Sequence, residues 1–184
     1  MRTNHTSCCF TGHRPAKLPW HYQESDPQCL ALKRRIAAVL EVLYQNEYRH
    51  FICGMALGCD HYFCECALAL RTSHPDITVE AAVPCPEQAS RWSQEQQTRY
   101  ARLLDACDFQ TMVSPQYTPF CMQKRDRYMV DRASLLVAVY DGSSGGTQYT
   151  IAYALQKGLS IVDIPVTVGG TPRFADWISS LETP

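Results

Sequence analysis

The sequence has little net charge, no long hydrophobic run and no zinc-type cysteine spacing, and each absence excludes a class of protein. Its 184 residues include 17 basic and 18 acidic side chains, which leave a formal net charge of −1. Dedicated nucleic-acid-coating proteins carry a strong basic excess, so this balance argues against that class. No apolar stretch is long enough to span a bilayer, and Met1–Thr6 lacks the apolar core of a secretory signal. We therefore expect a cytoplasmic protein without a membrane partner.

The ten cysteines lack the two-residue spacing of zinc knuckles and thioredoxin motifs; Cys64 and Cys66, for example, are separated by one residue. Most cysteines lie in apolar runs, where a reduced thiol behaves as a small hydrophobic side chain. His61 and Glu65 have the i, i+4 spacing of a metal-ligand pair but lack a third ligand. We therefore expect structural thiols and no metal site.

Short apolar segments alternate with segments of helical periodicity along the whole chain. The apolar segments predict strands at Ser7–Thr11, His50–Cys53, Ile77–Val83, Phe109–Val113, Ser134–Tyr140 and Leu159–Ile164. The other segments predict helices at Pro27–Tyr48, Asp60–Arg71, Ser93–Ala106, Phe120–Arg132, Thr147–Lys157 and, shorter, Phe174–Leu181. This alternation predicts an α/β fold: a three-layer, Rossmann-like, doubly wound and mainly parallel sheet of about six strands. Without repeats or low-complexity segments, residues 1–184 are expected to form one domain.

Four short segments carry the residues most suited to ligand binding. They are Thr11-Gly-His-Arg-Pro15, Cys53-Gly-Met-Ala-Leu-Gly-Cys-Asp60, Lys124-Arg-Asp-Arg127 and Asp141-Gly-Ser-Ser-Gly-Gly-Thr147. In parallel sheets, ligands bind beyond the carboxyl ends of the strands, where the direction of the connections reverses. Glycine permits close backbone approach, helix N-termini offer free amides to anions, and arginine pairs with phosphate. We predict a site formed by Gly12, His13, Arg14, Gly54, Gly58, Asp60, Arg125, Asp141, Gly142, Ser143, Ser144, Gly145, Gly146 and Thr147.

Within this set, the second and fourth segments are expected to hold phosphate, and Arg14 and Arg125 to neutralise its charge. Asp60 is a candidate acceptor for ribose hydroxyl groups. The last segment lacks the lysine of a Walker A loop, which argues against ATP hydrolysis by that mechanism. Plain structural interpretations stay open: the last segment is also a tight turn, Asp60 also a helix cap, and the helix around Arg125 and Arg127 also a solvated face.

Taken together, the four segments resemble those of the SLOG superfamily, the Rossmann-like group that links DNA-processing protein A with the LOG nucleotide phosphoribohydrolases. The first and last segments look most like the YpsA/YoqJ type. The second segment is similar to the Ser-Gly-x-Ala-x-Gly-Ile-Asp loop of the DNA-processing family. Residues 125–129 are similar to the Arg-Asn-Arg-Ile-Ile of that family and to the Arg-Lys-x-x-Met of the LOG enzymes. The resemblance covers nearly the whole chain and implies a shared fold and ligand pocket.

The chain departs from the LOG enzymes at the residues that carry their activity. Those enzymes contain Pro-Gly-Gly-x-Gly-Thr-x-x-Glu, whose glutamate works with the arginine to cleave an N-glycosidic bond. Here Thr150 matches the glutamate, Asp141 matches the proline, and Asp126 replaces the lysine that follows the arginine. Because threonine cannot act as a carboxylate, the resemblance implies ligand binding and does not carry phosphoribohydrolase activity with it.

Three functions stay open on the sequence. The first is the binding or sensing of a nucleotide or nucleotide-derived small molecule, with no further cofactor. The second is hydrolysis of an N-glycosidic or phosphoester bond, with Asp60, Glu65 and Asp141 as the candidate catalytic carboxylates. The third is single-stranded nucleic-acid binding through aromatic side chains, as in the DNA-processing relatives, which the near-neutral charge disfavours. Apolar faces on the late helices are compatible with a homodimer.

Overall fold

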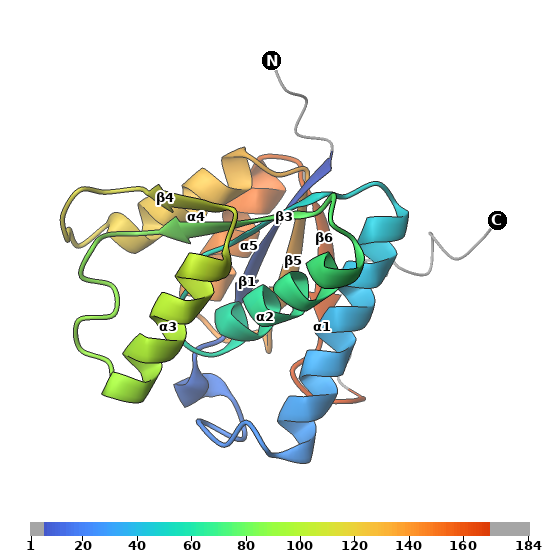
Figure 1. Cartoon of the computed structure of the whole chain (residues 1–184), viewed down its shortest axis with the longest axis horizontal. Coiled ribbons are helices and arrows are strands. Elements are labelled where there is room, and N and C mark those ends of the chain that lie inside the picture. The colour runs from blue at the N-terminus through green and yellow to red at the C-terminus, as the bar shows by residue number, and fades with distance from the viewer. Residues whose placement is uncertain (1–5, 170–184) are drawn as a thin grey trace.

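The computed structural model describes residues 6–169, in which six parallel strands form one sheet (Figure 1). The strands are β1 (Ser7–Gly12), β2 (His50–Cys53), β3 (Thr78–Val83), β4 (Phe109–Met112), β5 (Leu135–Val139) and β6 (Ser160–Ile164). The helices are α1 (Pro27–Gln45), α2 (Cys59–Ser73), α3 (Gln94–Ala106), α4 (Cys121–Asp131) and α5 (Gly146–Gln156), with a 3-10 turn η2 at Pro15–Lys17. The predicted α/β class is confirmed. The predicted helix at Phe174–Leu181 lies outside the described residues.

The order of the strands in the sheet is β4-β3-β2-β1-β5-β6. The chain therefore advances from β1 to β4 in one direction and then returns through α4 to begin again at β5, on the other side of β1. At the carboxyl end of this central pair, Gly12 lies opposite Val139. This is the position at which the connections diverge, and a crevice is expected there in a doubly wound sheet.

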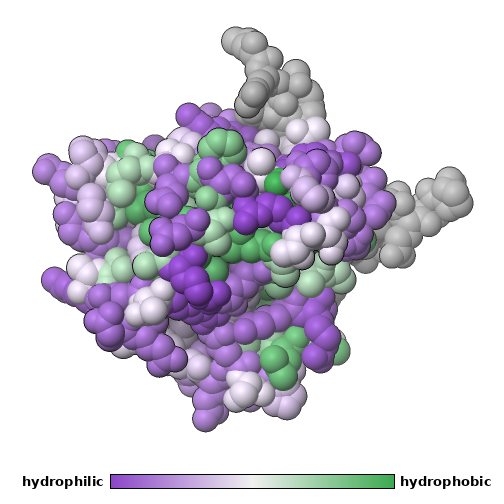
Figure 2. Space-filling model, in the orientation of Figure 1, coloured by the Kyte–Doolittle hydropathy of each residue, from purple (hydrophilic) through white to green (hydrophobic). Residues whose placement is uncertain are grey.

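Helices cover both faces of the sheet, which makes three layers (Figure 1). α1, α2 and α3 pack side by side on one face, and α4 and α5 pack on the other. One buried apolar cluster lies on each side of the sheet. On the face seen in Figure 2, hydrophilic residues predominate and hydrophobic ones form small separate groups. Both faces of the strands are thus buried, as parallel sheets require.

Local sequence signals explain several element boundaries. All five residues of β5 are buried, which matches its continuous apolar sequence. Ser93 caps α3 by accepting a hydrogen bond from the Gln96 N–H, while the Gln96 side chain bonds the Ser93 N–H in return. Helix α5 is followed by Gly158, whose φ of 77° is the left-handed conformation that ends many helices.

The ten cysteines all lie within the described residues as free thiols, most of them buried. Burial raises the pKa of several, including Cys8 and Cys59, so these thiols stay protonated and pack as small apolar groups. Across residues 6–169, none of the helices has the length and apolar character needed to span a membrane.

Candidate functional site

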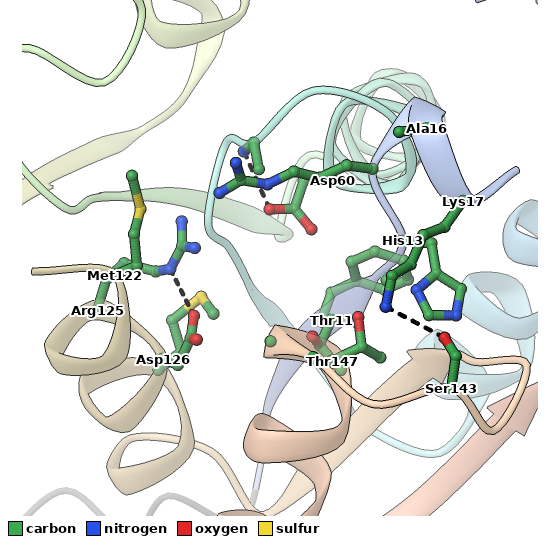
Figure 3. A pocket seen from close by; sticks show the side chains of 17 residues that line it. Thr11, His13, Ala16, Lys17, Asp60, Met122, Arg125, Asp126, Ser143 and Thr147 are labelled. Atoms are coloured by element: carbon green, nitrogen blue, oxygen red, sulfur yellow. Dashed lines mark hydrogen bonds and ion pairs between the residues drawn. The ribbon is translucent and has the colours of Figure 1, made fainter. Parts of the chain in front are cut away.

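A cavity of about 310 Å³ lies where the loops after β1 and β5 meet the starts of α2 and α5 and one side of α4 (Figure 3). Nine of the residues predicted from the sequence line it. They are Gly12, His13, Arg14, Asp60, Arg125, Ser143, Gly145, Gly146 and Thr147. Lys17 and Ser143 lie on one side, Arg125 and Asp126 on the other, and Asp60 between them (Figure 3). Residues from four separate segments of the chain therefore share one hollow.

Five other predicted residues are not among those that line the cavity. They are Gly54, Gly58, Asp141, Gly142 and Ser144. A Cβ atom on Gly54 would clash with the guanidinium group of Arg125, so glycine leaves room for that side chain. Asp141 supports the lining, since its Oδ1 lies 2.8 Å from Nε2 of His13. Gly54 and Asp141 thus support side chains that line the cavity.

Glu65, one of the three candidate catalytic carboxylates, is not among the residues that line the cavity. Its side chain pairs with the guanidinium group of Arg99, at 2.8 and 2.9 Å, and that pair ties α2 to α3. His61 is buried, and its Nε2 lies 3.2 Å from the carbonyl oxygen of Met55. Glu65 and His61 thus engage different partners, and the described residues contain no cluster of three or more metal-ligating side chains.

The loop after β1 is tied to the loop after β5 by a buried histidine. His13 is 3% exposed and bonds the Asp141 carboxylate. Burial lowers the pKa of His13, although Asp141 favours its charged form. Burial acts to raise the pKa of Asp141, but hydrogen bonds from Ser143 and the contact with His13 lower it to about 2. The ionised Asp141 therefore fixes both the histidine and the first turn of the loop that precedes α5.

Lys17 is a functional candidate that the sequence motifs missed. It ends the 3-10 turn η2, three residues after Arg14, and its Nζ donates to Ser143 Oγ at 3.2 Å and to the Ser144 carbonyl oxygen. The motif Thr11-Gly-His-Arg-Pro15 stops short of this residue. The only available signal was a cation within one turn of the motif. The structure brings that ammonium group across the loop that precedes α5.

Two amides of the second glycine segment are bonded within the protein. The Ala56 N–H donates to Asp60 Oδ2 at 3.0 Å, and the Cys59 N–H donates to the carbonyl oxygen of His13 at 3.1 Å. The acidic side chain of Asp60 thus occupies the positive N-terminal end of α2 that an anion would need. This segment contributes the carboxylate of Asp60 to the cavity, and the phosphate-binding role expected from its sequence stays a prediction.

Arg125 is buried, and its charge is already balanced within the protein. Nε donates to Asp126 Oδ1 at 2.7 Å, and Nη1 donates to the carbonyl oxygen of Gly54. Burial acts to lower the pKa of Arg125, but Asp126 and Asp60 raise it, so the guanidinium group stays charged. Arg127, by contrast, is exposed and bonds the hydroxyl group of Tyr149. The helix therefore presents a solvated face at Arg127 and a buried ionic cluster at Arg125.

The residue at the position of the LOG glutamate does not face the cavity. Thr150 is 1% exposed, and its hydroxyl group donates to the carbonyl oxygen of Gly146, one turn earlier in α5, at 3.0 Å. The first backbone N–H that bonds within this helix belongs to Tyr149, which donates to the Gly145 carbonyl oxygen. In an α-helix each N–H bonds the carbonyl oxygen four residues earlier, so the amides of the first turn, among them those of Gly146 and Thr147, have no partner within the helix.

Asp60 carries a strongly shifted pKa. Burial raises it to about 6, although the Arg125 and Arg14 guanidinium groups and the Ala56 N–H favour the ionised form. The folded protein therefore binds a proton more tightly than the unfolded chain, whose pKa is near the ordinary value of 3.8. The contribution of Asp60 to the free energy of unfolding accordingly falls as the pH rises from about 4 to above 6.

Asp60→Asn should remove this pH dependence, because the amide resembles the protonated carboxyl group. We expect the difference in unfolding free energy between variant and natural protein to move by about 2 kcal/mol in favour of the variant between pH 4 and pH 7. Urea unfolding at several pH values measures it. The matched control is Asp105→Asn on the exposed side of α3, for which no such change is expected. If the difference in unfolding free energy between Asp60→Asn and the natural protein is the same at pH 4 and pH 7, the raised pKa of Asp60 is wrong.

Comparisons with known proteins show the family and the fold of the chain. A profile of the YspA SLOG family matches residues 8–164. The SPbeta prophage-derived protein YoqJ of Bacillus subtilis (strain 168) is 38% identical over 143 residues, which cover 70% of this chain and 83% of that protein. A UPF0398 protein of Bacillus licheniformis is 23% identical over 158 residues, which cover 85% of this chain and 86% of that protein.

Solved structures of DNA processing protein A (DprA) share the fold. The Streptococcus pneumoniae protein superimposes with a TM-score of 0.59 at 14% identity, over 96% of this chain and 56% of that one. The Helicobacter pylori protein, described for its mode of binding single-stranded DNA, gives a TM-score of 0.60 at 14% identity, over 97% of this chain and 72% of that one. This chain thus spans only about half of the S. pneumoniae protein, and the likeness concerns the fold.

Proposed function

This chain belongs to the YspA SLOG family, and on that premise we propose that it binds a nucleotide or nucleotide-derived ligand whose phosphate lies at the start of α5. One observation carries the proposal: Lys17, Arg14 and the first turn of α5 converge on a single cavity. Two cations and a helix N-terminus form a strong combination for a phosphate group. The remaining wall supplies groups for the sugar.

The phosphate side of the cavity is formed by the loop before α5. Gly145 has a φ of 145°, and a Cβ atom there would lie 2.9 Å from Nζ of Lys17, so glycine leaves room for the ammonium group. The present partners of Lys17 are a serine hydroxyl group and a backbone carbonyl oxygen, both uncharged. A phosphate oxygen is a stronger acceptor for an ammonium group than either. Lys17 is therefore available to turn to a ligand without leaving a buried charge unpaired.

The opposite wall is acidic and suits a ribose. Asp60 and Asp126 both line the cavity, and the single charge of Arg125 offsets only part of theirs. Carboxylate oxygens accept hydrogen bonds from hydroxyl groups, and a nucleotide presents its ribose hydroxyls a short distance from its phosphate. An acidic wall also disfavours a second phosphate close to the first. These properties favour a ligand with one anionic end and one hydroxyl-rich centre.

Lys17→Ala should weaken the binding of 5′-mononucleotides and ADP-ribose by about tenfold, because it removes a charge-assisted hydrogen bond to phosphate. Isothermal titration calorimetry against a panel of mononucleotides, dinucleotides and ADP-ribose measures the change. Lys17→Arg should retain most of the affinity, since it keeps a cation on a side chain of similar reach.

Lys124→Ala is the matched control, because Lys124 is an exposed lysine of α4 that does not line the cavity. Its affinities should equal those of the natural protein. Two results would contradict the proposal. In one, the folded natural protein binds no member of the panel; in the other, Lys17→Ala and Lys124→Ala bind a panel member equally well.

A second candidate function, hydrolysis of a nucleotide bond, is favoured by one observation. The pKa of Asp60 is raised to about 6 by burial, and the residue lines the cavity, so its carboxyl group suits acid–base chemistry near neutral pH. Against it stands the buried threonine at the position of the LOG glutamate. Release of free base or phosphate from nucleoside monophosphates or ADP-ribose during long incubation distinguishes hydrolysis from binding alone.

Single-stranded DNA is a further source of nucleotide units. The H. pylori structure is described as binding single-stranded DNA, so the near-neutral charge of this chain is not sufficient to dismiss nucleic acid as a partner. An oligonucleotide that contacts Lys17 and Arg14 should bind at low salt and be released steeply as salt increases. A gel shift at two salt concentrations tests this against the binding of free nucleotides.

A further inference from the structure

A second cavity, of about 450 Å³, adjoins the first one and is lined by aromatic side chains. Its wall includes Cys85, Gln88, Arg91, Trp92, Tyr117 and Met122. Met122 also lines the first cavity, so one methionine side chain separates the two hollows. The residues come from the segment between β3 and α3, from the loop between β4 and α4, which holds Tyr117, and from the start of α4. None of them belongs to the four motifs that the sequence singles out.

Two aromatic rings in this cavity are placed for contact with a ligand. Trp92 meets the rings of His61 and Tyr100 nearly at right angles, with centroids 5.8 and 5.3 Å away. These contacts fix the indole ring, so it presents a defined surface to the cavity. Tyr117 is 62% exposed although it is a large aromatic residue. A fixed ring and an uncovered ring on one hollow are the elements of a stacking site.

A hydrogen-bonded wall connects the two cavities. The carbonyl oxygen of Gly54 accepts a hydrogen bond from Arg125, which lines the first cavity, and another from Gln88 Nε2 at 3.0 Å, which lines the second. The hydroxyl group of Tyr100 in turn donates to Gln88 Oε1 at 3.0 Å. Gln88 is therefore fixed from both ends of its amide, and its position is set relative to Arg125. One chain of hydrogen bonds thus runs from the first cavity to the second.

We propose that the second cavity binds the base of a nucleotide unit whose phosphate occupies the first cavity. The inference rests on the proposed function, since it extends the same ligand beyond Met122. A planar base stacks on aromatic rings with little dependence on its identity. The Gln88 amide retains one N–H and one lone pair with which to bond the edge of the base. The same unit occurs in a free nucleotide and in single-stranded DNA.

The test compares probes with and without a base. AMP, GMP, CMP and UMP carry both groups, whereas ribose 5-phosphate carries only the sugar and the phosphate. Tyr117→Ala and Trp92→Ala should each weaken mononucleotide binding by about tenfold and leave the affinity for ribose 5-phosphate unchanged. Trp92→Phe, which keeps an aromatic ring, should restore most of the loss. Lys17→Ala should weaken both kinds of probe.

Tyr22→Ala serves as the matched control, because Tyr22 is also exposed (65%) and does not line either cavity. Tyr117 is similarly exposed, so its replacement is not expected to disturb folding, which circular dichroism verifies. A single-stranded oligothymidylate is the third probe. If the Trp92 and Tyr117 variants lose affinity for this probe but not for mononucleotides, the second cavity binds a base of single-stranded DNA.

Each alternative result has a definite meaning. If Lys17→Ala weakens binding but the Trp92 and Tyr117 variants bind every probe as the natural protein does, the base site is wrong and the proposed function stands. Equal losses for mononucleotides and ribose 5-phosphate also overturn the base site. If the folded natural protein binds none of these probes, the proposed function fails and this inference fails with it.

Discussion

Arg125→Ala is expected to lower the free energy of unfolding by about 3–5 kcal/mol, the largest effect of any single substitution in the site. The guanidinium group is 5% exposed, and it is the cation beside the buried carboxylates of Asp60 and Asp126. Its removal leaves the two carboxylates close together without the cation that they share, and it deprives the Gly54 carbonyl oxygen of a donor. Urea unfolding at pH 7 measures the loss.

The pH dependence of this loss identifies its cause. Burial already raises the pKa of Asp60 to about 6, and removal of the arginine raises it further. Protonation of Asp60 below about pH 6 therefore relieves part of the charge repulsion, and the destabilisation should shrink as the pH falls to 5. A loss that is the same at pH 7 and pH 5 would point to lost packing and contradict the electrostatic explanation.

Two further variants are compared with Arg125→Ala for their stability in urea. Arg127→Ala removes an arginine two residues away that is exposed and contacts the rings of Tyr149 and Tyr153, and it should cost less than about 1 kcal/mol. Arg125→Lys keeps the charge but cannot donate in the two directions that Nε and Nη1 serve. It should lie between the other two variants in stability.

Gly58→Ala is expected to cost about 3 kcal/mol, because two separate penalties fall on one residue. Its φ of 89° is a left-handed conformation, which costs a side chain about 1–2 kcal/mol. A Cβ atom there would also lie 2.8 Å from the carbonyl oxygen of His13 and 3.1 Å from the backbone nitrogen of Pro15. Backbone atoms cannot rotate away as a side chain can, so overpacking adds about 1–3 kcal/mol.

Two other glycines separate the strain from the clash. Gly158 has a φ of 77° but nothing within 4 Å of its Cβ position, so Gly158→Ala should cost only about 1 kcal/mol. Gly146 begins α5 and has no neighbour within 4 Å, so Gly146→Ala should be neutral or stabilising by up to about 1 kcal/mol. Unfolding in urea ranks the three variants. Equal losses for Gly58→Ala and Gly158→Ala would mean that the loop after β1 moves aside without cost.

The elements themselves were predictable from local patterns. The apolar run at the fifth strand, the capping residue Ser93 and the glycine after α5 each act within a few residues of the structure they specify. Strand order was not predictable in this way, because a crossover can return a strand to either side of its predecessor. The exposed residues Phe109 and Met112 suit β4 to the edge of the sheet, whereas the fully buried β5 suits the position beside β1.

The sequence indicates the edge of the sheet near which several charged residues lie, but it does not indicate which partners their side chains bind. The motifs led to the edge of the sheet at which the first cavity lies, but not to Lys17, whose partners are more than 120 residues away in the chain. Glu65 and Asp60 were both candidate catalytic carboxylates, but Glu65 pairs with Arg99 outside the cavity, whereas Asp60 lines it. A carboxylate five residues further along a helix faces another direction, so small differences in register decide such roles.

By itself, the sequence determined the alternation of strands and helices, the family, and the presence of glycine turns at the carboxyl ends of neighbouring strands. Those features depend on periodicity and backbone freedom, which are local properties. Only the tertiary structure decided which charges meet: the pairing of Arg125 with Asp126 and Asp60, the reach of Lys17 across the loop before α5, and the aromatic hollow beside Met122. Hydrogen bonds and ion pairs act over a few ångströms, so contacts between residues far apart in the chain exist only once the sheet has brought them together.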